Sequence, residues 1–237
     1  VYDDLPSRDL EITVCSSERK TARVNGAKTA RATDLIGGLN AVFFGALDLR
    51  LVNGEPSARR RYMDLAVAQT SPAYCTELAG YKRSVDHRNR VLREMRDNPG
   101  ADFGLEIWND QVVRYGSPVV VRRTAFAAQL SGLASEAHAE LSGGRETLAV
   151  RYVPSIHCAA PDEEAVAAAF DEELARLRES EIRRGASLVG PHRDDLRFTV
   201  DGMEARSFAS QGQQRTVVLG LKIAEMQFME ARCGIPP

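Results

Sequence analysis

The sequence has no long hydrophobic run and no closely spaced cysteine pair. No apolar stretch approaches the roughly 18 residues that a membrane-spanning helix needs, and no charged segment followed by an apolar one marks an N-terminal signal. The four cysteines are far apart and include no Cys-x-x-Cys pair, which argues against a zinc site and against a disulfide framework. We therefore expect a cytoplasmic protein with reduced cysteines and no membrane partner.

A complete phosphate-binding P-loop is also missing. Residues 24–29 resemble the end of one, but Ala27 stands where the motif needs a glycine before Lys28. The Asn25-Gly26 pair in this stretch instead predicts a tight hairpin turn. Because the chain begins at Val1 without a methionine, we expect it to be part of a longer protein.

What the chain does contain is an uneven charge distribution behind a net charge of −2. Nine Lys and Arg residues stand against four acids between Arg59 and Arg96, whereas eight acids stand against two arginines between Asp162 and Glu181. The basic segment could follow a polyanion. Two solvated helix faces in a nearly neutral protein explain the same charges equally well.

The spacing of apolar residues predicts strands at both ends of the chain and helices between them. Residues 9–52 resemble short strands and turns, with a buried strand at Val42-Phe43-Phe44. Helices are expected from about 58 to 69 and from Pro72, after Ser71 as N-cap, and a second long helical run covers 105–141. Gly116-Ser117-Pro118 should kink or interrupt that run.

Two long helices joined by a short turn predict an antiparallel hairpin. A strand over 147–153, an acidic helix, a strand over 196–200 and a hairpin turn at Asp201-Gly202 should follow. The simplest fold is an α/β head with an inserted helical arm. We expect a strand-rich part of the head at 1–57, the helical arm at 58–184 and the C-terminal part of the head at 185–237.

Two arginines fall in the apolar seams of the long helices. Arg88 and Arg122 sit at positions otherwise taken by hydrophobic residues, where a charge needs a partner or a route to solvent. Each side chain either extends to solvent or pairs with an acid such as Asp86 or Glu136. The sequence does not decide between these alternatives.

The segment from Ser210 to Thr216 opens an apolar-periodic helix. Ser210 is an N-cap residue, and Gly212 has no Cβ, so that a ligand could approach the backbone closely. The free N–H groups of such a helix start suit a phosphate. An ordinary capped helix explains Ser210 and Gly212 as well.

Four segments, in this order and at these distances, closely resemble the RecF family of DNA repair and replication proteins, which are built on an ABC-type ATPase head like that of SMC proteins. They are Leu51–Asp64, the stretch around His87-Arg88-Asn89, Gly190–Asp195 and Ser210–Thr216. The resemblance covers nearly the whole chain. The two last segments, separated by a hairpin, are its most specific part.

The resemblance implies an ATP-dependent dimeric clamp that binds single-stranded and double-stranded DNA at gaps, with ATP and Mg²⁺ as cofactors. It implies roles in recombinational repair and the SOS response, with recombination-mediator proteins as partners. Within it, the residues of the ABC signature motif close over the ATP that is held by a second subunit: Ser210, Gln211, Gly212, Gln213 and Gln214. The intact protein would be a weak DNA-dependent ATPase.

The chain departs from the family pattern in three places. The implied P-loop should precede residue 1, and the apolar strand that ends in Mg²⁺-binding acids should follow Pro237. Ala46-Leu47 stand where the family usually has proline and an acid, which weakens any nucleotide role for that loop. This chain alone therefore lacks catalytic residues for ATP hydrolysis and ligands for a metal.

For DNA, six basic residues are candidates for phosphate contacts without base readout: Arg59, Arg60, Arg61, Lys82, Arg83 and Arg90. Arg59–Arg61 could instead pair with acids of the head. Two other classes of function remain: a non-enzymatic coiled-coil DNA-binding scaffold, and a metal-dependent hydrolase that uses His192, Asp194 and Asp195.

Overall fold

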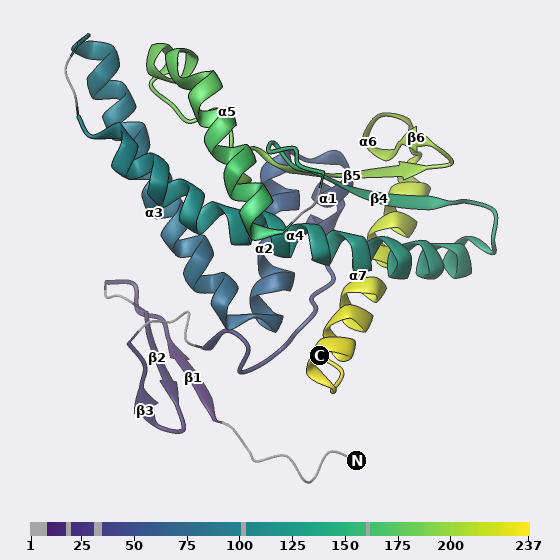
Figure 1. Ribbon diagram of the computed structural model, residues 1–237. Coiled ribbons are helices and arrows are strands. Elements are labelled where there is room, and N and C mark those ends of the chain that lie inside the picture. Colours follow the sequence, from purple (N-terminus) through teal and green to yellow (C-terminus); the bar gives the residue numbers. More distant parts are fainter. Residues whose placement is uncertain (1–8, 18–19, 31–34, 101–102, 160–161) are drawn as a thin grey trace.

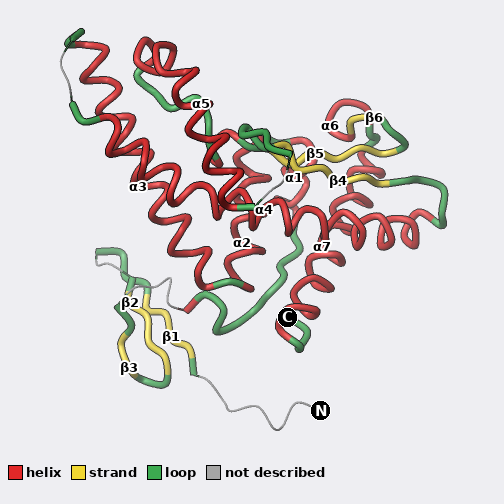
Figure 2. The backbone as a smooth tube through the Cα atoms, viewed as in Figure 1, coloured by secondary structure: helices red, strands yellow, loops and turns green. Residues whose placement is uncertain are grey.

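Helices make up most of the structure, and the strands form two small sheets at separate places, as Figure 2 shows. The computed structural model describes residues 9–17, 20–30, 35–100, 103–159 and 162–237. The first sheet contains β1 (Leu10–Thr13), β2 (Thr21–Val24) and β3 (Ala27–Lys28), and the second contains β4 (Leu148–Val153), β5 (Asp195–Val200) and β6 (Met203–Glu204). Both sheets are antiparallel, so the α/β head is matched only in part.

Both predicted hairpin turns are confirmed. Asn25 and Gly26, between β2 and β3, have φ of 50° and 78°, and Asp201 and Gly202, between β5 and β6, have φ of 51° and 78°. Positive φ at both central residues gives a turn whose twist matches that of the flanking strands, and Asn-Gly and Asp-Gly tolerate it best.

The described residues form seven α-helices, in chain order: α1 (Arg50–Asn53), α2 (Pro56–Thr70), α3 (Pro72–Asp97), α4 (Leu105–Ser142), α5 (Glu163–Arg184), α6 (Ala205–Phe208) and α7 (Gln211–Cys233). Figure 1 shows α3 and α4 side by side with α5 next to them, which confirms the predicted hairpin. Ser71 is the N-cap residue of α3, but its side chain makes no capping hydrogen bond. No helix within the described ranges is long and apolar enough to cross a membrane.

The main hydrophobic core lies where α2, α4, β4, β5 and α7 meet. It includes Val52, Met63, Leu130, Phe198 and Leu221, which come from all three expected segments of the chain. A second cluster fills the space among α3, α4 and α5. Because one core spans both boundaries, packing does not mark a separation at residue 57 or at residue 184. The division into three parts stays a prediction.

Helix α4 runs through Gly116-Ser117-Pro118 without interruption, although its ribbon bends in Figure 1. Gly116 lies against the neighbouring helices, because a Cβ there would come within 2.8 Å of Phe170 and 3.0 Å of Tyr81. The glycine thus allows α3 and α5 to pack closely on α4. The predicted interruption is therefore absent, because this tertiary packing outweighs the local preference of the three residues, whereas the bend of α4 agrees with the predicted kink.

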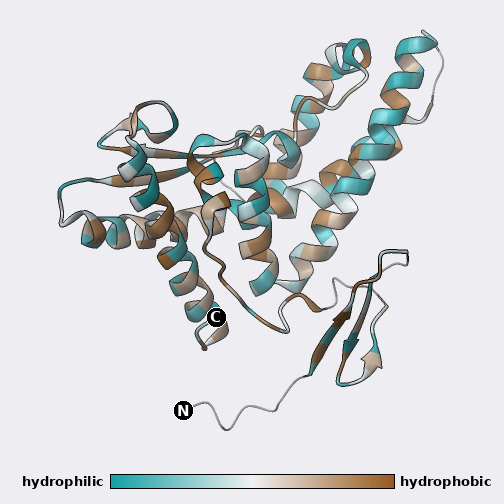
Figure 3. Ribbon diagram, turned by 180° about the vertical axis from the view of Figure 1, so that it is seen from behind, coloured by the Kyte–Doolittle hydropathy of each residue, from teal (hydrophilic) through white to brown (hydrophobic). Residues whose placement is uncertain are grey.

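The prediction of a buried strand at Val42-Phe43-Phe44 was also wrong. The segment is irregular, and the side chains of Phe43 and Phe44 are 78% and 57% exposed. Figure 3 shows hydrophobic stretches in the chain that leads into α1. A strand needs a partner for its backbone groups, and within the described ranges no strand pairs with this segment.

Candidate nucleotide and nucleic-acid sites

Ser210 begins α7 with a reciprocal capping box. Its Oγ accepts a hydrogen bond from the backbone N–H of Gln213 at 3.2 Å, and the Gln213 side-chain oxygen accepts one from the N–H of Ser210 at 2.8 Å. This arrangement satisfies two backbone donors and fixes the direction of the chain into the helix. The Ser210 hydroxyl keeps its own hydrogen, which it can still donate to a ligand.

The first turn of α7 leaves two backbone donors for a ligand. In the part of the chain that the structure describes, the N–H groups of Gln211 and Gly212 have no hydrogen-bond partner, and both residues are exposed. A Cβ on Gly212 would have only Ser210 Oγ within 4 Å, at 3.8 Å. Packing inside this chain therefore does not require the glycine, whereas an approaching phosphate would benefit from the open space.

Residues distant in sequence contact the side chains of the first turn of α7. Gln213 Nε2 donates to Glu146 Oε1 at 3.0 Å, and Glu146 also contacts His138 Nε2 at 3.1 Å. Asn53 Nδ2 donates to Gln214 Oε1 at 3.4 Å. Sequence reasoning missed Glu146 and Asn53, since no local pattern links either of them to the signature segment. The first turn of α7 is thus supported from both sides.

The Gly190–Asp195 block is a structural junction. Asp194 is fully buried, and its carboxylate accepts hydrogen bonds from the Ser155 N–H at 2.8 Å, from Arg123 Nη1 at 3.3 Å and from the Tyr152 hydroxyl. Burial is the main reason that the pKa of Tyr152 is raised, and the Asp194 carboxylate raises it further. These contacts join β4, α4 and the start of β5.

His192, Asp194 and Asp195 do not converge on one point. With its proton on Nε2, His192 donates to the Ser187 carbonyl at 3.2 Å and accepts at Nδ1 from the Tyr81 hydroxyl at 2.6 Å. Burial lowers the pKa of His192 to about 4. Asp195 instead faces Arg59, and no group of three possible ligands occurs among the residues that the structure describes. The geometry gives no support to the metal-dependent hydrolase.

The six DNA candidates divide into paired and unpaired residues. Arg59 is only 5% exposed, binds Asp195 through two hydrogen bonds of 2.7 and 2.9 Å, and so takes the alternative role of pairing with an acid of the head. Arg60 Nη1 donates to the Asp194 carbonyl at 2.8 Å, and burial lowers the pKa of Arg60. Lys82 Nζ lies 3.5 Å from Asp64.

Arg61, Arg83 and Arg90 are exposed, and the described part of the chain offers them no ion pair. A pocket of about 580 Å³ between α2 and α3 adds to this positive surface. Its charged lining residues are Arg60, Arg61, Asp64, Lys82 and Arg123, and His192 lines it as well. Of the six candidates, the exposed residues beside α2 and α3 are therefore the ones whose side chains are accessible to phosphates.

Both seam arginines pair with acids, although not with those named from the sequence. Arg88 Nη2 lies 2.6 Å from Glu181 Oε2, and Arg122 Nε lies 2.8 Å from Glu77 Oε2. The prediction of Asp86 and Glu136 as partners was wrong, because each arginine pairs with an acid from a packed neighbouring helix. The partner of Arg88 comes from α5 and that of Arg122 from α3.

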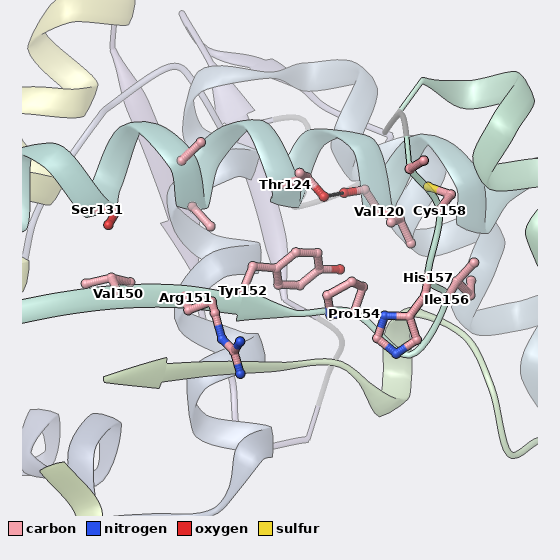
Figure 4. A pocket seen from close by; sticks show the side chains of 13 residues that line it. Val120, Thr124, Ser131, Val150, Arg151, Tyr152, Pro154, Ile156, His157 and Cys158 are labelled. Carbon is pink, nitrogen blue, oxygen red and sulfur yellow. Dashed lines mark hydrogen bonds between the residues drawn. The ribbon is translucent and has the colours of Figure 1, made fainter. Parts of the chain in front are cut away.

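A second pocket, of about 570 Å³, lies between α4 and β4 and is shown in Figure 4. Small and uncharged side chains line most of it, among them Thr124, Ser131 and Val150, while Arg151 points toward β5. None of the candidate site residues that the sequence predicted lines this pocket.

Comparison with known proteins matches this chain to RecF proteins. It is 42% identical over 237 residues to the DNA replication and repair protein RecF of Synechocystis sp., a match that covers 97% of this chain and 62% of the relative. The RecF protein of Bacillus subtilis is 37% identical over 226 residues, with 94% and 61% covered. No family model matches the chain.

A solved structure of the recombination mediator protein RecF with ATPrS, of the RecFOR pathway, superimposes with a TM-score of 0.92 at 26% identity. The match covers 99% of this chain and 63% of that one, and a RecF–ATP structure gives a TM-score of 0.91. The chain spans about three fifths of the length of these relatives. Over the region that it spans, the chain belongs to the RecF family.

Proposed function

We propose that this chain supplies the signature half of a composite ATP site in a dimeric DNA-binding clamp. The other half, with the P-loop and the Mg²⁺ ligands, would come from a partner subunit of the same kind. The clamp would bind duplex or gapped duplex DNA and act in recombinational repair and the SOS response, together with recombination-mediator proteins. Family membership supports this proposal, and the start of α7 carries it.

The observation that carries the ATP part is a set of free donors at one exposed helix start. The N–H groups of Gln211 and Gly212 and the hydrogen of the Ser210 hydroxyl are available together. Bound ATP would supply the negative charge of its terminal phosphate. Each charge-assisted hydrogen bond to such a group contributes about 1.5–3 kcal/mol, and the dipole of α7 adds about 0.3–1 kcal/mol.

The DNA part rests on the exposed basic residues beside α2 and α3. Arg61, Arg83 and Arg90 are free of ion pairs within the described residues, and Lys82 is held only by a 3.5 Å contact. Such residues neutralise phosphates and position the protein without reading sequence. Arg59 has almost no exposed surface to contribute, and Arg60 contributes at most the part of its side chain that lines the pocket.

Two substitutions at Ser210 test the ATP part. Asp and Asn are as good at an N-cap position as Ser, so both variants should keep α7 intact. Ser210→Asp places a negative charge against the phosphate and should weaken ATP-dependent self-association by about ten- to a hundredfold. Ser210→Asn, which is neutral and of nearly the same size as Asp, should weaken it much less.

The measurement is sedimentation velocity with and without ATP, on a polypeptide that includes the P-loop implied by the family resemblance. Equal ATP-dependent association of the wild type and Ser210→Asp would contradict the assignment of the signature loop. Association that needs no nucleotide and is insensitive to salt would favour a coiled-coil scaffold instead.

A further inference from the structure

Two heteroaromatic rings stack on the outer side of the helical hairpin. The rings of His87 on α3 and Trp108 on α4 have centroids 4.5 Å apart and planes only 7° from parallel. His87 is exposed, whereas Trp108 is partly buried. Trp108 is the only tryptophan in the chain. The pair therefore presents a flat ring to solvent with a second ring behind it.

The core fixes the position of the inner ring. Trp108 packs against the buried side chains of Val91, Leu92 and Leu105, which close the end of the hairpin. Since the first half of α4 packs with α3 and α5 in a buried cluster, the two rings sit on a rigid support. Little ordering of these side chains would be needed when a third ring is added to the stack.

Unpaired arginines flank the exposed ring. Arg83 lies four residues before His87 and Arg90 three residues after it, so all three share one face of α3. Both arginines are exposed, and neither has an ion pair in the described part of the chain. Asp86 and Glu94 are the acids nearest to them in sequence, and in the described residues neither acid forms an ion pair with either arginine. Seven residues of helix separate the arginines by about 10 Å along the axis.

We propose that the His87–Trp108 stack is a platform for an unpaired base of single-stranded DNA next to a duplex, with Arg83 and Arg90 contacting the phosphates on either side. Aromatic rings beside a basic surface are how proteins hold single strands without sequence preference, because every base has a flat face. The inference rests on the proposed DNA-binding function and deepens it. It names the unpaired nucleotide as the part of a gapped duplex that this face recognises.

The test compares two labelled DNA molecules by fluorescence anisotropy: a blunt duplex and the same duplex with an oligothymidine extension. His87→Ala should weaken binding of the extended DNA about five- to tenfold, at the low end of the stacking range, and leave the blunt duplex unchanged. His87→Tyr, which keeps a ring, should retain the preference. His157→Ala removes another exposed histidine from outside α3 and α4 and is the matched control.

Trp108 gives a direct second signal, since all tryptophan emission of the protein comes from it. The extended DNA should change this emission along the same binding curve, and the blunt duplex should not. If the wild type binds both DNA molecules but His87→Ala binds the extended one equally well and the emission stays constant, the platform is overturned and DNA binding stands. If the wild type binds neither DNA, the proposed DNA-binding function itself fails.

Discussion

Arg88 and Glu181 form an ion pair that is almost completely removed from water inside the helical hairpin. The exposed fractions of the two side chains are 1% and 0%, and the Arg88 Nη2 to Glu181 Oε2 distance is 2.6 Å. Arg88 also donates to Ser187 Oγ at 2.9 Å and to Asn109 Oδ1 at 2.8 Å, and Glu181 accepts from the Leu188 N–H at 2.7 Å. The pair thus joins α3, α4 and the end of α5.

Removing one partner of this pair should be costly. Arg88→Met leaves Glu181 as a buried carboxylate without its counter-charge, which typically costs about 3–5 kcal/mol in the free energy of unfolding. Urea denaturation followed by circular dichroism measures the loss. Arg178→Met breaks the exposed pair with Glu106 and should cost less than about 1 kcal/mol. Similar losses for the two variants would contradict the buried character of the Arg88 pair.

Protonation of His192 should destabilise the protein as the pH falls. The folded-state pKa is lowered to about 4 by burial, so the unfolded chain takes up a proton near pH 6.5 that the folded protein refuses until about pH 4. The stabilising contribution is present above pH 6.5 and is lost as the pH falls to 4, by up to about 3 kcal/mol. His192→Asn should flatten this part of the stability profile, measured by urea denaturation at pH 8 and pH 5. If the free energy of unfolding differs between pH 8 and pH 5 by the same amount in His192→Asn as in the wild type, His192 is not the cause of the loss.

Substitutions of Arg59 and Arg61 should have different effects, because Arg59 is expected to be structural and Arg61 to bind DNA. Arg59→Met breaks the buried pair with Asp195 and should cost about 3 kcal/mol or more in stability. Arg61→Met, at an exposed position, should change stability by less than about 0.5 kcal/mol. It should instead weaken duplex binding and reduce the slope of log affinity against log salt by about 0.9. An unchanged slope for Arg61→Met would remove Arg61 from the interface.

The capping box should make a measurable contribution to folding. Ser210→Ala removes the acceptor for the Gln213 N–H and should lower the free energy of unfolding by about 1 kcal/mol. Ser210→Asn restores an acceptor and should recover most of this loss. If Ser210→Ala is as stable as the wild type in thermal denaturation, the hydrogen bond is absent in solution.

Local chemistry explains which features could be predicted from the sequence. The Ser210 cap and the Asn25-Gly26 and Asp201-Gly202 turns depend on one or two residues and their neighbours, and the structure has all three. The alternation of Leu196, Phe198 and Val200 correctly placed their side chains in the core. Each of these features is settled within a few residues of chain.

Features that depend on distant partners were out of reach. Counting in threes and fours placed Arg122 in the seam of α4, yet Arg123 is the residue that is 2% exposed, between Asp64 and Asp194. A drift of one position over a long helix is enough to exchange the two. Asp64, Glu146 and Glu181 likewise acquire their roles from helices and strands far away in the chain.

The Gly190–Asp195 junction has a mechanical consequence. Arg59 and Arg60 on α2 bind Asp195, the first residue of β5, and the carbonyl of Asp194 before it, and from there only the β5–β6 hairpin and α6 lead to Ser210. If α2 moves, either these hydrogen bonds break or β5 moves together with α2. The surface proposed to bind DNA and the donors proposed to bind ATP are thus connected through β5, β6 and α6, and Arg59 and Arg60 join this connection to α2.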